Sequence, residues 1–269
     1  MTFPVKFSIV LFLGLLLFQA RANPSPKEKC QALIEAAVNA TDRNEFGIAI
    51  KKLGQAEIVM GENHWPDKMW HIKNVYGISY AGLSNYGKAL KYFNKAMDIV
   101  EDTPKLTKNK LSIVNNVALV FVYKKEYQKA ITYYKSTFQS VKIFHSSSEY
   151  EQLMKKVLGV NLASLYNEIG QYDKGRKILM ETASIQTRKD VMQLWQVTYT
   201  ENLFLRGHTE EALRKAQKMY KETLEKKKKF AMSASWTCYQ RYMPQRERLK
   251  KPFFIPIKPL PTILSGNPK

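Results

Sequence analysis

The segment SNYGKAL, residues 84–90, decides the fold, because degenerate copies of it recur along the chain. The copies are NEFGIAI at 44–50, KEYQKAI at 125–131, GQYDKGR at 170–176 and GHTEEAL at 207–213. The sixth residue of every copy is small, and these residues are Ala49, Ala89, Ala130, Gly175 and Ala212. By subtraction they are 40, 41, 45 and 37 residues apart. Periods of this length are typical of repeated helical hairpins.

Helical spacing surrounds each of these small residues. Phe93 and Ala96 follow Ala89 by four and seven positions, so all three share one face of a helix. Gly77 and Tyr80 precede Ala89 by twelve and nine positions, in a second predicted helix. A small residue there lets the two helices approach closely, and the aromatic ring fills the space beside it. We therefore predict that each copy opens the second helix of a hairpin.

These five positions in the second copy, Gly77, Tyr80, Ala89, Phe93 and Ala96, resemble the tetratricopeptide repeat (TPR) pattern. The fifth copy fits least well, because it keeps Ala212 but has Thr200 and Leu203 in its first helix. The resemblance covers about residues 28–225, and it implies an all-α, right-handed α-solenoid of about five TPR-like helix-turn-helix repeats. The longer period is also similar to the extracytoplasmic TPR regions of Bacteroidetes-type sensor/regulator proteins.

The resemblance implies a concave binding face, lined by the first helix of each hairpin. Five asparagines and one tyrosine project onto that face, and they are Asn74, Asn115, Asn116, Tyr123, Asn161 and Asn167. Asparagine both donates and accepts hydrogen bonds, so such a row is suited to an extended or helical peptide. The alternative is that these asparagines pair with neighbouring helices. The expected partner is a protein or a peptide ligand.

The chain of 269 residues has a formal net charge of +20, and 45% of it is hydrophobic. Residues 226–269 hold eleven Lys or Arg against one Glu, which accounts for about half of the excess charge. We interpret the remainder as Lys-rich, solvated helix faces. This distribution does not favour a nucleic-acid partner for the segment.

The N-terminus predicts export. Lys6 precedes an apolar run from Phe7 to Phe18, and Ala20-Arg21-Ala22 follows as a small-residue cleavage site. We expect residues 1–22 to be a signal peptide, residues 23–229 to form the solenoid, and the mature chain to be periplasmic or secreted. No second apolar stretch is long enough to predict a stable transmembrane span in the mature chain.

Residues 230–269 break the helical pattern and are basic and rich in proline. They follow four consecutive lysines, residues 226–229, whose codons can form a slippage-prone run of adenines. We therefore hold two hypotheses for this tail: a disordered extension, or the product of a frameshift that removed a sixth repeat. In the second case the chain is the truncated sensor portion of a membrane-spanning signalling or transcriptional regulator.

No arrangement of residues points to catalysis. The chain lacks the Gly-x-Ser-x-Gly, His-Glu-x-x-His and phosphate-loop motifs. Its four histidines, at positions 64, 71, 145 and 208, do not have the spacing of metal ligands, and its two cysteines do not make a disulfide framework. We expect no enzyme activity, no cofactor and no metal, and we predict a non-catalytic interaction scaffold.

Overall fold

The computed structural model describes residues 24–141 and 147–225, and these parts contain ten α-helices and no strand. The first helices of the hairpins are α2 (Pro26–Asp42), α4 (Pro66–Gly82), α6 (Lys110–Tyr123), α8 (Glu149–Glu168) and α10 (Lys189–Leu205). The second helices are α3 (Phe46–Met60), α5 (Tyr86–Glu101), α7 (Tyr127–Ser140), α9 (Tyr172–Glu181) and α11 (Thr209–Glu225). A short 3₁₀ helix, η1 (Pro104–Asn109), precedes α6.

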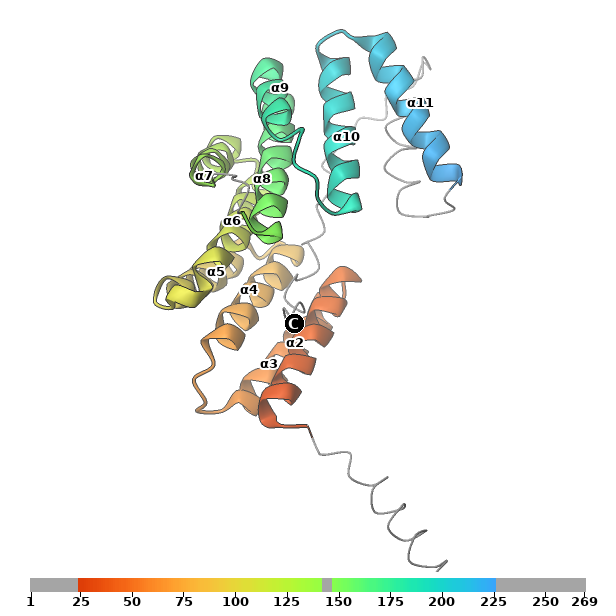
Figure 1. Cartoon of the computed structure of the whole chain (residues 1–269). Helices are drawn as coiled ribbons and strands as arrows, with labels where there is room; N and C mark the ends of the chain where they lie inside the picture. The colour runs from red at the N-terminus through yellow and green to blue at the C-terminus, as the bar shows by residue number, and fades with distance from the viewer. Residues whose placement is uncertain (1–23, 142–146, 226–269) are drawn as a thin grey trace, which may run out of the picture.

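Consecutive helices pair into five hairpins, and each hairpin packs on the next in chain order (Figure 1). The stack runs from α2 and α3 at one end to α10 and α11 at the other (Figure 1). The predicted all-α architecture is confirmed, and each of the five copies contains the start of the second helix of a hairpin, as predicted. The predicted signal peptide and the tail 230–269 lie outside the described residues.

One turn geometry joins the two helices of every hairpin. Each turn contains a residue with positive φ, and these residues are Asn44, Ser84, Lys125, Gly170 and Gly207. The amide of the following residue donates to a carbonyl in the last turn of the first helix, as from Asn85 to Tyr80 at 2.8 Å. This pattern caps the helix end with a left-handed residue. The two helices of every hairpin are therefore connected by a turn of the same conformation.

Small residues set the contact between paired helices, as predicted. A Cβ atom on Gly77 would lie 2.4 Å from the ring of Phe93, so α4 and α5 meet at this glycine. Ala89 and Ala96 are fully buried on the same face of α5. Gly82, in the last turn of α4, leaves equivalent room for Phe46 from α3, at 2.3 Å. Alanine at either glycine would therefore push an aromatic ring out of place.

A lysine lies over an aromatic ring in each of the three middle hairpins. The Nζ atoms of Lys88, Lys129 and Lys174 are 5.2, 5.6 and 5.9 Å from the ring centroids of Tyr80, Phe121 and Tyr166. Each lysine follows its aromatic residue by eight positions and precedes the small residue of the repeat. These cation–π contacts close the turn end of each hairpin.

The expectation that the lysines lie on solvated faces is wrong for Lys155 and Lys156 of α8, which are buried. Lys155 donates to the carbonyl of Phe138, near the end of α7. Lys156 donates to the carbonyls of Thr182 and Ile185, at 2.9 and 2.8 Å, just beyond α9. Burial lowers the pKa of Lys156 to about 8. The two ammonium groups therefore cap the C-terminal ends of two neighbouring helices, where carbonyls lack partners within the helix.

Candidate functional site

The predicted asparagines lie on the first helices and bond to one another. The Nδ2 atom of Asn116 in α6 donates to Oδ1 of Asn74 in α4, at 3.0 Å. The Nδ2 atom of Asn161 in α8 donates to Oδ1 of Asn115 in α6, at 2.8 Å. All four side chains are buried. The amides thus connect three consecutive hairpins.

Tyr134 of α7 completes this network from the second helix of the third hairpin. Its hydroxyl accepts from Nδ2 of Asn161 at 3.3 Å and donates to the carbonyl of Asn115 at 3.4 Å. Burial raises the pKa of Tyr134, so the hydroxyl stays protonated as a donor. Most of the hydrogen bonds of these asparagines are therefore made to neighbouring helices. This is the alternative to peptide contact that the sequence left open.

Asn167 takes part in a separate pair. The Nδ2 atom of Asn202 in α10 donates to Oδ1 of Asn167 at 2.7 Å and to the carbonyl of Tyr172 at 2.8 Å. Both asparagines are buried. Sequence analysis missed Asn202, although it follows Asn167 by 35 residues, close to one repeat period. Asn167 therefore joins the fourth hairpin to the fifth.

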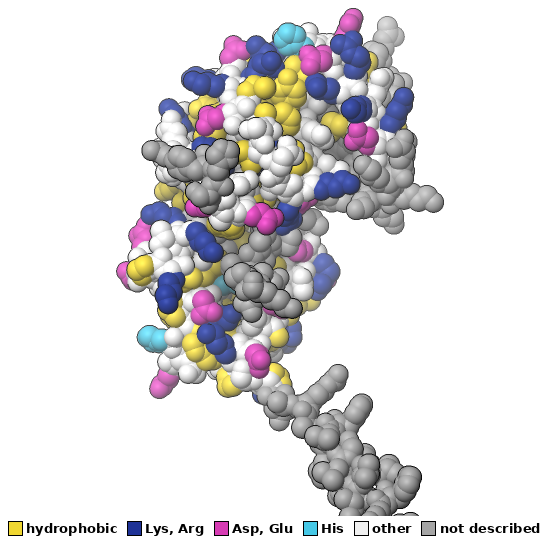
Figure 2. Space-filling model, in the orientation of Figure 1, with side chains coloured by type: hydrophobic (Ala, Val, Ile, Leu, Met, Phe, Trp, Pro, Cys, Tyr) yellow, Lys and Arg dark blue, Asp and Glu magenta, His cyan; other side chains and the backbone are white. Residues whose placement is uncertain are grey.

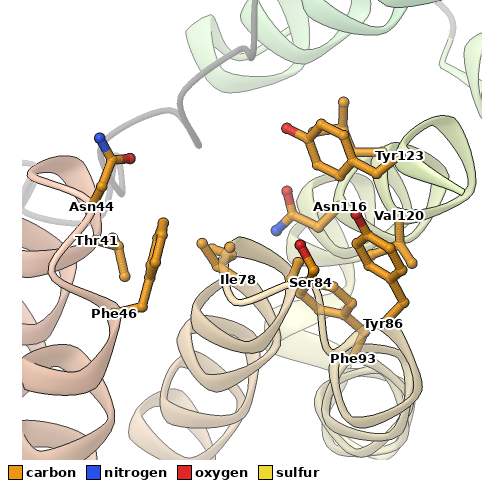
Figure 3. A pocket seen from close by; sticks show the side chains of 13 residues that line it. Thr41, Asn44, Phe46, Ile78, Ser84, Tyr86, Phe93, Asn116, Val120 and Tyr123 are labelled. Atoms are coloured by element: carbon orange, nitrogen blue, oxygen red, sulfur yellow. The ribbon is translucent and has the colours of Figure 1, made fainter.

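A pocket opens where the first three hairpins meet, and we call it the hairpin 1–3 pocket (Figure 3). Its volume is about 390 Å³. Phe46 and Ile78 line one side, Tyr86 and Tyr123 line the other, and Asn116 lies between them. Asn116 and Tyr123 are the two predicted contact residues that reach this pocket.

The lining of the pocket contains no Asp, Glu, Lys, Arg or His. Its polar groups are hydroxyls and amides, such as those of Ser84 and Asn116. Arg43 and Glu45, on either side of Asn44 in the sequence, pair with each other, because Nη2 of Arg43 lies 2.8 Å from a carboxylate oxygen of Glu45. The pocket therefore suits an uncharged, largely apolar group that also offers a hydrogen-bonding atom.

Two tyrosines form one wall of the pocket. The rings of Tyr86 and Tyr123 are 6.4 Å apart between centroids and 18° from parallel. Burial, with a smaller contribution from Tyr86, raises the pKa of Tyr123. Its hydroxyl is therefore neutral at physiological pH. Tyr123 is also 39% exposed, so a ligand can reach it.

Charged side chains are distributed rather than clustered on the visible face, where acidic groups lie among the lysines and arginines (Figure 2). Within residues 24–141 and 147–225, no three His, Cys, Asp or Glu side chains form a group that could hold a metal ion. No helix in these ranges is long and apolar enough to cross a membrane. His71 is buried and stacks on Trp70, and His145 lies outside the described residues.

The chain resembles solved structures of helical repeat proteins. NprR in complex with its cognate peptide NprX is 14% identical, with a TM-score of 0.56 over 86% of this chain. The apo form of the quorum sensor NprR from B. thuringiensis is 13% identical, with a TM-score of 0.59 over 82%. TPR-like repeats of a putative kinesin light chain from Podosopora anserina are 12% identical, with a TM-score of 0.51 over 80%. The chain has a TPR-like fold.

The TPR-like chain spans 66% and 61% of the two NprR chains and 97% of the kinesin light chain repeats. No family model matches its sequence, and no curated protein matches it. At these identities the likeness shows the arrangement of the hairpins. It does not show which residues bind a ligand, so these residues have to come from the geometry of this chain.

Proposed function

We propose that this TPR-like chain is a non-catalytic interaction module that binds a peptide segment of a protein partner. The observation that carries the proposal is the hairpin 1–3 pocket, which is uncharged and is lined by α4 and α6 together with residues of the first two turns and of α3 and α5. The likeness to NprR supports it, because NprR, a protein with a similar arrangement of hairpins, was solved in complex with its cognate peptide.

The geometry also supports a division of labour along this face. The buried amides of Asn74, Asn115 and Asn161 bond to Asn116 or to each other across three hairpins, so they fix the spacing of the hairpins. Asn116 and Tyr123, which line the pocket, are placed to contact a ligand. A peptide would therefore bind on a surface that the amide network holds preorganised, which lowers the entropic cost of binding.

The test is a selection of random ten-residue peptides on the immobilised full-length chain, followed by hydrogen exchange of the complex. We expect to recover peptides with saturable binding. We also expect the bound peptide to slow amide exchange more in α4 and α6 than in α5 and α7. Saturable binding with protection confined to α7 and α9, which do not line the pocket, would place the ligand elsewhere on the protein. A selection that yields no saturable peptide would overturn the proposal.

We further propose that the protein works outside the cytoplasm, in the periplasm or after secretion. The support is the sequence of residues 1–22, with its basic start, apolar run and Ala20-Arg21-Ala22 site. Mass spectrometry of the protein from its native host is the test, and we expect a mature N-terminus at Asn23. An intact Met1 in the mature product would contradict export.

The alternative, a sensor portion truncated by a frameshift, remains a separate hypothesis. Its support is the run of four lysines at 226–229 and the change of composition after it. Resequencing the gene across these codons tests it. A reading frame that continues into a sixth repeat would support a longer regulator. A gene sequence that encodes residues 226–269 as they stand would contradict the frameshift.

A further inference from the structure

We propose that the hairpin 1–3 pocket selects one bulky, uncharged side chain of the bound peptide, with an aromatic side chain preferred. This inference rests on the proposed peptide-binding function and adds the chemistry of the ligand. It makes the pocket the position that decides which sequences bind. Helices α4 and α6 on either side provide the surface for the peptide backbone.

The first support is the size of the pocket. A volume of about 390 Å³ lies near the lower end of the range of roughly 300–1,000 Å³ that is typical of small-ligand sites. This space suits one large side chain with part of its own backbone. A small side chain would leave much of the apolar wall in contact with water or empty space, and the lost contacts would weaken its binding.

The second support is the absence of charge in the lining. A charged side chain that entered would lose its hydration and meet no opposite charge, because no acidic or basic side chain lines the pocket. Glu45, between the lining residues Asn44 and Phe46, pairs with Arg43. Lys124, which follows Tyr123, pairs with Glu126. The site therefore discriminates against lysine, arginine, aspartate and glutamate.

The third support is the aromatic character of the walls. Phe46 and the tyrosines at 86 and 123 present rings from three different hairpins. Aromatic rings attract one another in offset and edge-to-face arrangements, beyond the contribution of buried area alone. Phe46 itself is held over Gly82, where a Cβ atom would clash with its ring. This close packing fixes one wall of the pocket.

The fourth support is the amide of Asn116. Its Nδ2 atom donates to Asn74, and its Oδ1 atom accepts a long bond of 3.4 Å from Asn115. An amide has two N–H groups and two acceptor lone pairs, so one N–H and one lone pair remain for a ligand. A peptide unit offers the complementary C=O and N–H. Asn116 is therefore placed to bond to the backbone beside the selected side chain.

The experiment uses the full-length chain and the peptides recovered by the random selection, with affinities measured by fluorescence anisotropy. We expect the peptides to share one position occupied by Phe, Tyr, Trp or a large aliphatic residue. Alanine at that position should weaken binding by about tenfold, as for a buried anchor residue. Lysine or glutamate there should weaken it by at least about 100-fold, because a charge would be buried without a partner.

Two substitutions of the same kind separate the pocket from the rest of the surface. Ile78→Trp fills the pocket and should weaken binding by about tenfold or more. Ile58→Trp is the matched control, because Ile58 is 81% exposed on α3 and does not line the pocket. It should leave affinity within about twofold. Thermal unfolding followed by circular dichroism confirms that both variants fold.

A second matched pair does not depend on filling the pocket. Tyr123→Ala removes one ring from its wall, whereas Tyr133→Ala removes a ring of similar exposure, 42% against 39%, from α7. Each tyrosine stacks on one aromatic neighbour, Tyr86 for Tyr123 and Phe121 for Tyr133. We expect weaker binding for the first variant only.

Peptides without a shared bulky residue, or equal binding by both members of each pair, would overturn the inference and leave peptide binding intact. A selection without any saturable peptide would overturn the proposed function and this inference together. The two failures are therefore distinguishable in one set of measurements.

Discussion

At the residue scale, Gly175 occupies the position where all four other copies have a fully buried alanine. A Cβ atom there would lie 2.8 Å from Oδ1 of Asn167 and 3.1 Å from the carbonyl of Ala163. We expect Gly175→Ala to lower the free energy of unfolding by about 1–3 kcal/mol, because it displaces the buried Asn167–Asn202 pair. Urea unfolding measures this change.

Gly87→Ala is the control for that substitution, because nothing lies within 4 Å of a Cβ atom at this exposed position in α5. It should raise the free energy of unfolding by roughly 0.5 kcal/mol through helix propensity. A stabilising effect of Gly175→Ala would show that the amide pair does not need the glycine.

His71 gives a prediction about pH. Burial, with a smaller contribution from Lys68, lowers its pKa to about 4 from an ordinary value of 6.5. The unfolded chain therefore binds a proton more readily than the folded chain between these pH values, and stability falls as the pH falls through this window. Between pH 7 and pH 4.5, His71 should account for a loss of about 2–3 kcal/mol.

His71→Phe keeps a flat ring against Trp70 and removes the titrating group. The carboxylates contribute equally to both proteins, so the comparison isolates His71. We expect urea unfolding at the two pH values to show a smaller loss for the variant. An equal loss in both proteins would contradict a buried, neutral His71.

At the scale of the element, the turns between paired helices differ in the residue that adopts positive φ. Lys125 has φ of 61° and Gly170 has φ of 76°, at equivalent places in consecutive hairpins. A residue with a Cβ atom is strained there by roughly 1 kcal/mol. Lys125→Gly should therefore stabilise the protein by about 0.5 kcal/mol after the entropy of glycine is counted, and Gly170→Ala should destabilise it by about 1 kcal/mol. Thermal unfolding tests the opposite signs, and equal signs would contradict the shared turn geometry.

The elements were largely predictable, because their cause is local. Ala89, Phe93 and Ala96 repeat at helical spacing within a few turns, and that spacing predicts which face is buried. The partners of the asparagines depend instead on helices 35 to 46 residues away, as with Asn202 and Asn167 or Asn161 and Asn115. The helical pattern contains no information about which amide bonds to which.

The buried lysine could not be predicted from the sequence either, because its partners are also distant in the chain. Lys156 looks like a surface lysine, and its acceptors are carbonyls 26 and 29 residues further along the chain. The hairpin 1–3 pocket likewise requires side chains from three hairpins. Two of its residues, Asn116 and Tyr123, were predicted as contacts from the resemblance, whereas Phe46, Ile78 and Tyr86 were not.

At the scale of the whole molecule, stability should vary along the stack. Every residue from 153 to 163 in α8 is buried, since α6, α7, α9 and α10 all contact this helix. Among the described helices, the first hairpin, α2–α3, has a neighbour on one side only, and that neighbour is α4. Because repeat proteins are stabilised by their neighbours, we expect amide hydrogens of α8 to exchange at least about tenfold more slowly than those of α3. Hydrogen exchange with mass spectrometry measures this, and uniform protection would contradict it.

The shared turn geometry has a consequence for how genes of this kind can change in length. Because the same turn joins the two helices of every hairpin, duplicating or deleting one whole period keeps first and second helices in alternation along the chain. A change of half a period would instead place two first helices in succession along the chain, with no second helix between them. Lineages should therefore differ by whole hairpins, and such differences would lengthen or shorten the binding face in steps while the pocket stays with the first three.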